Sequence, residues 1–86
     1  MEGGIAAQTN SVLEKIDALL DAMGASRSNV LSVTIYLANM QEFAAMNAIW
    51  DAWFPADTAP TRTCVEARLA RPLVLIEITV VAATSG

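Results

Sequence analysis

The spacing of apolar residues along the chain predicts two helices and three strands. Over residues 6–23, apolar side chains recur every three or four positions, the period of one helical face. They are Val12, Leu13, Ile16, Leu19, Leu20 and Met23. Gly24 follows directly and is typical of the glycine just beyond a helix end. We therefore predict a first helix over 6–23 with this stripe packed on the core.

A strand and a second helix follow. Over 29–38 the residues alternate, with Leu31, Val33, Ile35 and Leu37 on one side and Ser32, Thr34 and Tyr36 on the other. Asn39, with Glu42 three residues later, predicts the N-cap of a helix over 40–53, which Pro55 ends. The apolar face of this helix consists of Phe43, Met46, Trp50, Trp53 and Phe54.

Two more strands are predicted over 61–69 and 73–83. The first places Arg62, Cys64, Glu66 and Arg68 on one face. The second has one apolar face, Val74, Ile76, Ile78, Val80 and Ala82, and one mixed face, Leu73, Leu75, Glu77, Thr79 and Val81. The short connection at Pro72 predicts antiparallel neighbours. The order αβαββ predicts one α+β domain over 1–86, with two helices on one sheet face and a subunit interface on the other.

The composition favours an oligomer and excludes several classes of function. Of the 86 residues, 55% are apolar and 16% charged, so apolar side chains exceed what a lone core this small can bury. A net charge of −4 with one lysine argues against a nucleic-acid partner. With no histidine and one cysteine, a zinc site or a disulfide within one chain is not expected. We expect no signal peptide and no membrane span, and the lone thiol favours the cytoplasm.

Two residues stand out as candidates for chemistry. Glu77 interrupts an almost continuous apolar strand, and burial there would tune its carboxylate for acid–base work. Alternatively, Glu77 faces water or pairs with an arginine. Arg62 has the planar fork that suits a carboxylate ligand, although it could equally be a surface residue or the partner of Glu77.

Four further polar residues give weaker signals. Cys64 could line a site or simply pack, as buried free cysteines usually do. Asn47, one residue from the apolar stripe of the second helix, is either a boundary amide or a pocket residue. Glu66 and Arg68 predict a solvated ion pair.

The sequence resembles the RidA/YjgF/UK114 family along nearly its whole length. The strongest motifs are Pro60-Thr61-Arg62-Thr63-Cys64-Val65-Glu66 and Ile76-Glu77-Ile78-Thr79-Val80-Val81-Ala82, which follow the family pattern P-x-R-[ST]-x-V and V/I-E-I-x-x-x-A. Blocks that match upstream are Ala7-Gln8-Thr9, Gly24-Ala25-Ser26, Val33-Thr34-Ile35-Tyr36-Leu37 and Phe43-Ala44-Ala45-Met46-Asn47. Any one block is weak, whereas the C-terminal signature formed by the two motifs, preceded by these four blocks in the right order, is specific.

The resemblance implies a fold, an assembly and an activity. The fold is a chorismate-mutase-like sheet, three subunits of which pack sheet to sheet into a barrel with a pocket in each cleft. Family members hydrolyse enamine and imine products, such as 2-iminobutanoate and 2-iminopropanoate, to 2-oxo acids and ammonia without a cofactor. Arg62 would clamp the substrate carboxylate, Glu77 would position the attacking water, and Cys64 and Asn47 would line the pocket.

The family usually has further strands before its first helix, so the resemblance also implies a chain shortened at its N-terminus. Three hypotheses follow. The first is an imine deaminase. The second is a non-catalytic oligomeric module that binds small carboxylates through Arg62. The weakest is a chorismate-mutase-like enzyme, because a dianionic substrate needs several cations and only Arg62 is well placed.

Overall fold

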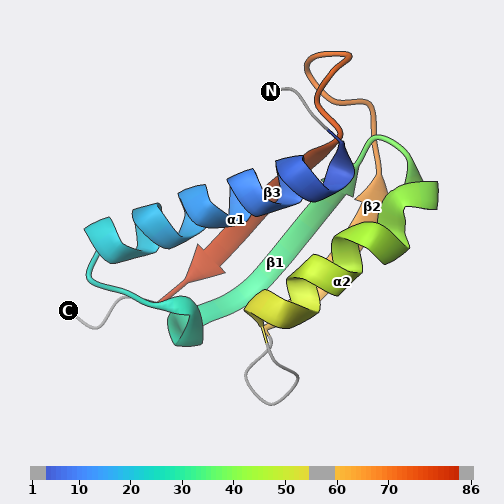
Figure 1. The fold of residues 1–86 in the computed structure, drawn as a ribbon. Helices are drawn as coiled ribbons and strands as arrows, with labels where there is room; N and C mark the ends of the chain where they lie inside the picture. Colours follow the sequence, from blue (N-terminus) through green and yellow to red (C-terminus); the bar gives the residue numbers. More distant parts are fainter. Residues whose placement is uncertain (1–3, 55–59, 84–86) are drawn as a thin grey trace.

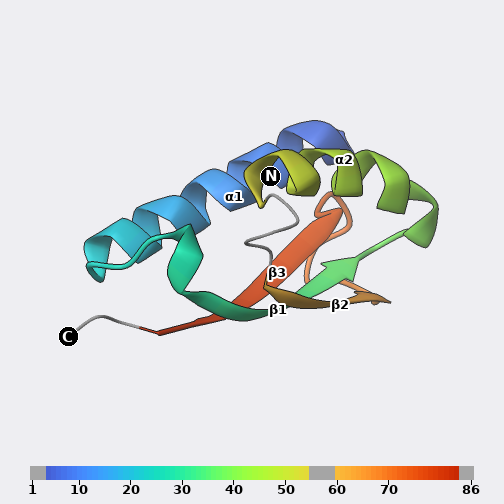
Figure 2. The same cartoon turned by 90° about the horizontal axis from the view of Figure 1, so that it is seen from below.

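A computed structural model describes residues 4–54 and 60–83 and confirms the predicted order αβαββ. The main elements are α1 (Ile5–Ala22), β1 (Val30–Leu37), α2 (Phe43–Trp53), β2 (Thr61–Glu66) and β3 (Ile76–Ala82), with 3₁₀ turns η1 (Arg27–Asn29) and η2 (Met40–Glu42). Both α-helices lie on the same face of the three-stranded sheet (Figure 1), as the view from below also shows (Figure 2). The α+β class is therefore confirmed. No helix in the described ranges is long and apolar enough to cross a membrane.

The end of α1 has the conformation that its glycine predicts. Gly24 has a φ of +73°, in the left-handed region that favours glycine. Its N–H donates to the Asp21 carbonyl (3.1 Å), and the Ala25 N–H donates to the Leu20 carbonyl (2.8 Å). These two bonds form a Schellman motif. A Cβ at Gly24 would meet no atom within 4 Å, so only the backbone conformation requires glycine here.

The apolar stripe of α1 is only partly buried. Leu13 and Leu20 lie in the core, whereas Leu19 is 66% exposed and Met23 is 54% exposed. The prediction that the whole stripe packs on the core is wrong for these two residues. They lie on the flank of α1 beside β3, which is an edge strand, so nothing in the described chain covers them.

A β-bulge near the start of β1 changes which side chains face the helices. The register of its pairing with β3 shifts between Val30 and Ser32. As a result Val30 is buried, and Leu31 is 56% exposed. The prediction that Leu31 shares a face with the later buried residues of this strand is wrong, because the extra residue breaks the alternation.

The strand order is β2-β1-β3, so the prediction that the last two strands are neighbours is wrong. β2 runs parallel to β1 through the α2 crossover, and β3 pairs antiparallel with the other side of β1. The connection 67–75 crosses the end of β1. There the Ala67 N–H donates to the Leu37 carbonyl (2.9 Å), and the Ala38 N–H donates to the Leu75 carbonyl (3.0 Å). This crossing makes both strands shorter than predicted.

Two polar side chains hold the start of the second helical segment. Asn39 Oδ1 accepts a hydrogen bond from the Gln41 N–H (2.9 Å), which confirms the predicted N-cap. Glu66 Oε1 accepts from the Met40 N–H (2.7 Å). Glu66 thus ties β2 to η2, and no ion pair joins it to Arg68 among the described residues, contrary to prediction.

The apolar face of α2 packs on the core, as predicted. Its buried members are Met46, Trp50 and the capping residue Phe54. Trp50 and Phe54 stack with ring centroids 4.5 Å apart. α2 ends at Trp53, and Pro55, which was predicted to end it, lies outside the described residues.

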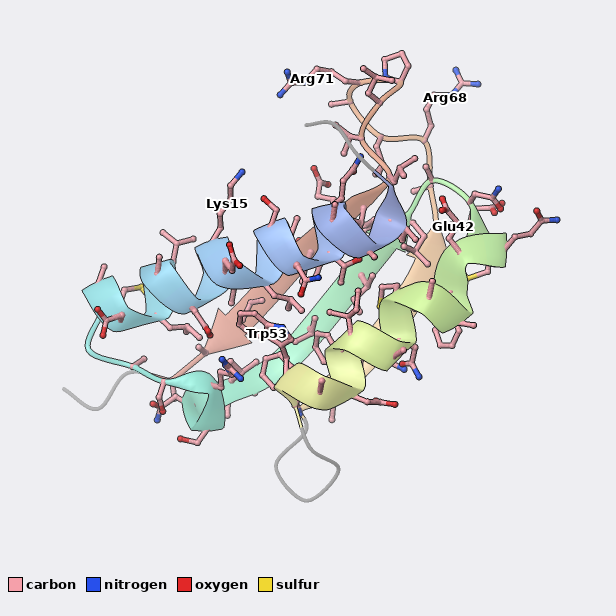
Figure 3. All side chains as sticks on the ribbon, viewed as in Figure 1. Lys15, Glu42, Trp53, Arg68 and Arg71 are labelled. Atoms are coloured by element: carbon pink, nitrogen blue, oxygen red, sulfur yellow. The ribbon has the colours of Figure 1, made fainter. Side chains whose placement is uncertain are left out.

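Arg27 joins the C-terminal ends of α1 and α2. Its Nε and Nη2 donate to the Asp17 carboxylate at 2.9 and 2.8 Å, and its Nη1 donates to the Trp53 carbonyl at 3.0 Å. The guanidinium also lies 4.1 Å from the centroid of the Trp53 ring. Figure 3 shows this ring between the two helices. The hydrogen bonds that Arg27 donates to Asp17 raise the pKa of the guanidinium, so the clamp stays charged.

Gln8 is the main polar contact between α1 and the segment before β3. The residue is 0% exposed. Its Nε2 donates to the Leu73 carbonyl (2.8 Å), and its Oε1 accepts from the Leu75 N–H (2.7 Å). The amide thus pairs with the backbone as a neighbouring strand would. Because residues 73–75 make this contact, Leu73 and Leu75 do not lie on the open sheet face as predicted.

Candidate functional site

Arg62 projects from β2 toward the helical side of the sheet. It pairs with Val33 of β1, a buried residue under the helices, so their side chains share a face. The guanidinium carbon lies 5.5 Å from the Phe43 ring centroid and 5.4 Å from that of Trp50. Both distances lie within the range of cation–π attraction. Arg62 is half-buried, and it meets no carboxylate among the described residues.

Asn47 orients this guanidinium. Arg62 Nη1 donates to Asn47 Oδ1, and Asn47 Nδ2 donates weakly to Asp51 at 3.4 Å. Phe43, Asn47 and Trp50 follow the i, i+4, i+7 spacing of one helical face, so α2 presents all three to β2. Asn47 is therefore a positioning residue for Arg62, and the structure brings these two predicted site residues together.

Cys64 lies two residues beyond Arg62 on the same face of β2. It is half-buried and packs against the hydrophobic core. Burial raises the pKa of the Cys64 thiol, and the nearby positive charge of Arg62 opposes that effect in part. The thiol is therefore protonated at neutral pH, which favours packing over nucleophilic chemistry.

Glu77 lies on the opposite face of the sheet from Arg62. It pairs with Tyr36 of β1, three positions beyond Val33, which pairs with Arg62. An odd offset along one strand places the two side chains on opposite faces. Glu77 is exposed in the single chain, so the expected desolvation is absent there. The alternative of an Arg62–Glu77 ion pair is likewise excluded by this geometry.

The open face that carries Glu77 is more polar than predicted. The residues on it are Ser32, Thr34, Tyr36, Thr61, Thr63, Val65, Glu77, Thr79 and Val81. Hydroxyl groups predominate, and no described helix covers them (Figure 2). The side chains suit a wet interface or a polar binding surface more than a dry apolar one.

Sequence reasoning missed the aromatic contacts of Arg62 and the roles of Glu66 and Gln8. The aromatic contacts of Arg62 could have been predicted, because Phe43, Asn47 and Trp50 are spaced along one face of the helix. No group of three or more potential metal ligands lies together in the described ranges.

Comparisons with known proteins agree with the resemblance. The model of the family described as "Endoribonuclease L-PSP" matches residues 1–84. The chain belongs to this family, which is the RidA/YjgF family. The RutC family protein YoaB of Escherichia coli K12 is 47% identical over 76 residues, which are 88% of this chain and 67% of that protein.

Solved family structures share the fold. The YjgF family protein NMB1025 of Neisseria meningitidis has a TM-score of 0.93 and 45% identity, over 99% of this chain and 73% of that one. A protein titled "putative translation initiation inhibitor" from Salmonella typhimurium has a TM-score of 0.91 and 44% identity, over 95% and 71%. These likenesses confirm the predicted RidA-like fold.

Proposed function

We propose that this chain, assembled with copies of itself, hydrolyses 2-imino acids and their enamine tautomers to 2-oxo acids and ammonia. One observation carries the proposal. Arg62 is a half-buried guanidinium, oriented by Asn47 and two aromatic rings, that meets no carboxylate among the described residues. Such a group is suited to bind a ligand carboxylate through two parallel hydrogen bonds. Family membership supports the same reaction.

In the proposed reaction, Arg62 holds the substrate carboxylate and thereby fixes the adjacent imine carbon. Water adds to that carbon while Glu77 accepts a proton from the water, and the nitrogen then takes up this proton to give the neutral carbinolamine. The resulting carbinolamine then forms the carbonyl group and expels ammonia. As the carbonyl forms, the hydroxyl proton also passes to the nitrogen, so that Glu77 ends as the carboxylate it was at the start. One water is consumed and one ammonia is released, with no change of oxidation state, so we propose no cofactor.

The placement of Arg62 and Glu77 argues for a site shared between subunits. Their strands are separated by β1, and their registers differ by three residues, so their Cα atoms lie roughly 14 Å apart by standard sheet spacings. The side chains also point away from each other. We therefore propose that Arg62 of one subunit acts with the Glu77 of a neighbour, in a trimer and in the cytoplasm.

A mixing experiment tests the shared site. Arg62→Lys and Glu77→Gln should each lose turnover of imine generated in situ from serine by a dehydratase. When the two variants are unfolded together and refolded, about one quarter of the shared sites should contain both native residues. Recovery of a comparable fraction of parent activity supports the proposal. An active parent whose mixed variants recover nothing would place both residues in one subunit's site and overturn the shared arrangement.

Ligand binding separates the enzyme from a non-catalytic carboxylate-binding module. Arg62→Lys keeps the charge but loses the planar fork, so affinity for 2-oxobutyrate should fall roughly ten- to a hundred-fold. Tryptophan fluorescence provides the readout, because Trp50 lies beside Arg62. Arg68→Lys is the control, since Arg68 points into solvent at the far end of the molecule (Figure 3). Binding without turnover would favour the module, and no Arg62-dependent binding would refute both functions.

A ribonuclease function has less support. The description of the matching family refers to an endoribonuclease. However, a chain with a net charge of −4 and no histidine lacks the basic surface and the commonest acid–base residue for cleaving RNA. The absence of a nucleic-acid partner remains a prediction.

A further inference from the structure

Asp51 lies one helical turn beyond Asn47 on α2 and ends a short chain of hydrogen bonds that starts at Arg62. Arg62 Nη1 donates to Asn47 Oδ1, and Asn47 Nδ2 donates to the Asp51 carboxylate at 3.4 Å. Residues four positions apart lie on the same helical face, so α2 presents both side chains toward β2. The guanidinium is thus linked to a carboxylate through one neutral amide.

The position of Asp51 within its own helix is electrostatically unfavourable. α2 ends at Trp53, so Asp51 lies in the last turn. The carbonyl groups at this end of a helix carry partial negative charge, which favours cations and disfavours anions there. None of the described residues in this turn is basic, so no cation offsets the carboxylate. A charge that lowers the stability of its own helix is typical of a functional position, and the link to Arg62 identifies the function.

The amide between the two charges keeps the guanidinium available. A carboxylate in direct contact would occupy the fork of Arg62 and compete with a ligand carboxylate. Asn47 contributes a single oxygen to Nη1 instead. An amide carries its acceptor on one side and its donors on the other, so Arg62 and Asp51 select the same orientation of Asn47. With the amide turned over, two donor groups would face each other and the contact with Arg62 would be lost.

We propose that Asp51 is a positioning residue of the carboxylate site. It holds the Asn47 amide in the orientation that aims Arg62, while the other N–H groups of the guanidinium bind the ligand. This role rests on the proposed function, in which Arg62 binds the substrate carboxylate. Asp51 acts through Asn47, so its removal should loosen the guanidinium and weaken ligand binding without unfolding the chain.

The order of the Arg62 side chain can be measured without a ligand. Isotope-edited NMR should resolve separate signals from its two Nη groups in the parent, and Asp51→Ala should average them. Asp21→Ala is the matched control, because it also removes an exposed aspartate from the last turn of a helix but on α1. Both variants change the net charge equally. An Asp51→Ala spectrum like that of the control overturns the proposal.

Affinity for 2-oxobutyrate measures the consequence for the ligand. Asp51→Ala should weaken binding roughly three- to tenfold, the equivalent of one modest hydrogen bond. Simple electrostatics predicts the opposite sign, because this variant lacks a negative charge that repels the ligand. In an Asn47→Ala background the same change should not weaken binding, since the link to Arg62 is already absent. Equal weakening in both backgrounds would show that Asp51 acts without Asn47 and would contradict the proposal.

Thermal unfolding separates positioning from a general loss of structure. Asp51→Ala should melt at or above the temperature of the parent, because an unfavourable charge leaves the helix end. A lower melting temperature would assign Asp51 a structural role and refute the inference. The proposed function is tested separately by the parent itself. A parent that binds no 2-oxobutyrate refutes that function, and the NMR comparison then still decides whether Asp51 aims Arg62. A parent that binds, with Asp51→Ala binding as tightly as Asp21→Ala, keeps the function and refutes the role of Asp51.

Discussion

Replacing Gln8 should destabilise the fold more than any other polar substitution on α1. Gln8 is fully buried and makes two hydrogen bonds of 2.7 and 2.8 Å to backbone groups of the segment before β3. Gln8→Ala leaves the Leu73 carbonyl and the Leu75 N–H without this partner. Each buried group that loses its hydrogen bond lowers the stability by about 1–3 kcal/mol. Relaxation and water entry reduce the sum, so we expect a loss of about 2–4 kcal/mol in unfolding free energy.

A loss of this size is a large fraction of the stability of a small domain. Chains of this length unfold with roughly 4–13 kcal/mol, and each kcal/mol shifts the melting temperature by about 4–8 °C. Urea unfolding followed by tryptophan fluorescence measures the difference. A Gln8→Ala variant within about 0.5 kcal/mol of the parent would refute the assigned role, because that is the range of ordinary surface substitutions.

The isosteric variant Gln8→Glu separates hydrogen bonding from packing. It keeps the shape of the side chain and one acceptor, but it places a carboxylate against the Leu73 carbonyl. Burial would raise the pKa of the new carboxyl group above its unfolded value of about 4.3. The variant should therefore be least stable near pH 7 and regain stability as the pH falls through the raised pKa, where the protonated group donates to Leu73. A pH-independent deficit would show that packing alone accounts for the loss.

Two other experiments test local features. Gly24→Ala should lower the unfolding free energy by about 1–2 kcal/mol, because a residue in the left-handed conformation must then carry a Cβ, while no clash adds to the cost. Gly4→Ala is the control, because Gly4 is extended and has equal space around it. Equal effects of the two substitutions would contradict the assignment of Gly24 as the helix cap. The Cys64 thiol should react with iodoacetamide more slowly than a free cysteine, with a pH–rate midpoint above that of the free thiol, because its pKa is raised. A midpoint below the free-thiol value would show that the charge of Arg62 outweighs burial.

Local sequence patterns were enough to predict the helices and strands. The order of the strands in the sheet could not be predicted in this way, because it depends on contacts between residues far apart in the sequence. The first helix and its glycine cap follow from spacing within one segment. The order β2-β1-β3 does not, because β1 serves both neighbours and the link 67–75 is long enough to cross it. A bulge such as that at Leu31 arises from pairing and leaves no clear mark in an alternating sequence.

For the candidate site too, the sequence indicated the residues but not the sheet face on which each of them lies. Arg62, Asn47 and Cys64 were predicted together and lie together on the helical side. Glu77 was expected beside them, but which face a residue occupies depends on register across β1, which the sequence of one strand cannot supply. Gln8 could have been identified, since an amide within an apolar helical stripe must find partners when buried.

The central position of β1 has a consequence for synthesis on the ribosome. β3 is the last described strand to emerge, yet it pairs with β1 and lies beneath α1, and the segment before it makes both hydrogen bonds to Gln8, 65 and 67 positions away. Until these residues leave the exit tunnel, one edge of β1 has no partner strand, and Gln8 and the flank of α1 beside β3 have nothing to pack against. The nascent chain must therefore hold this flank of α1 exposed until β3 has emerged, which makes it a natural client for chaperones that bind apolar segments.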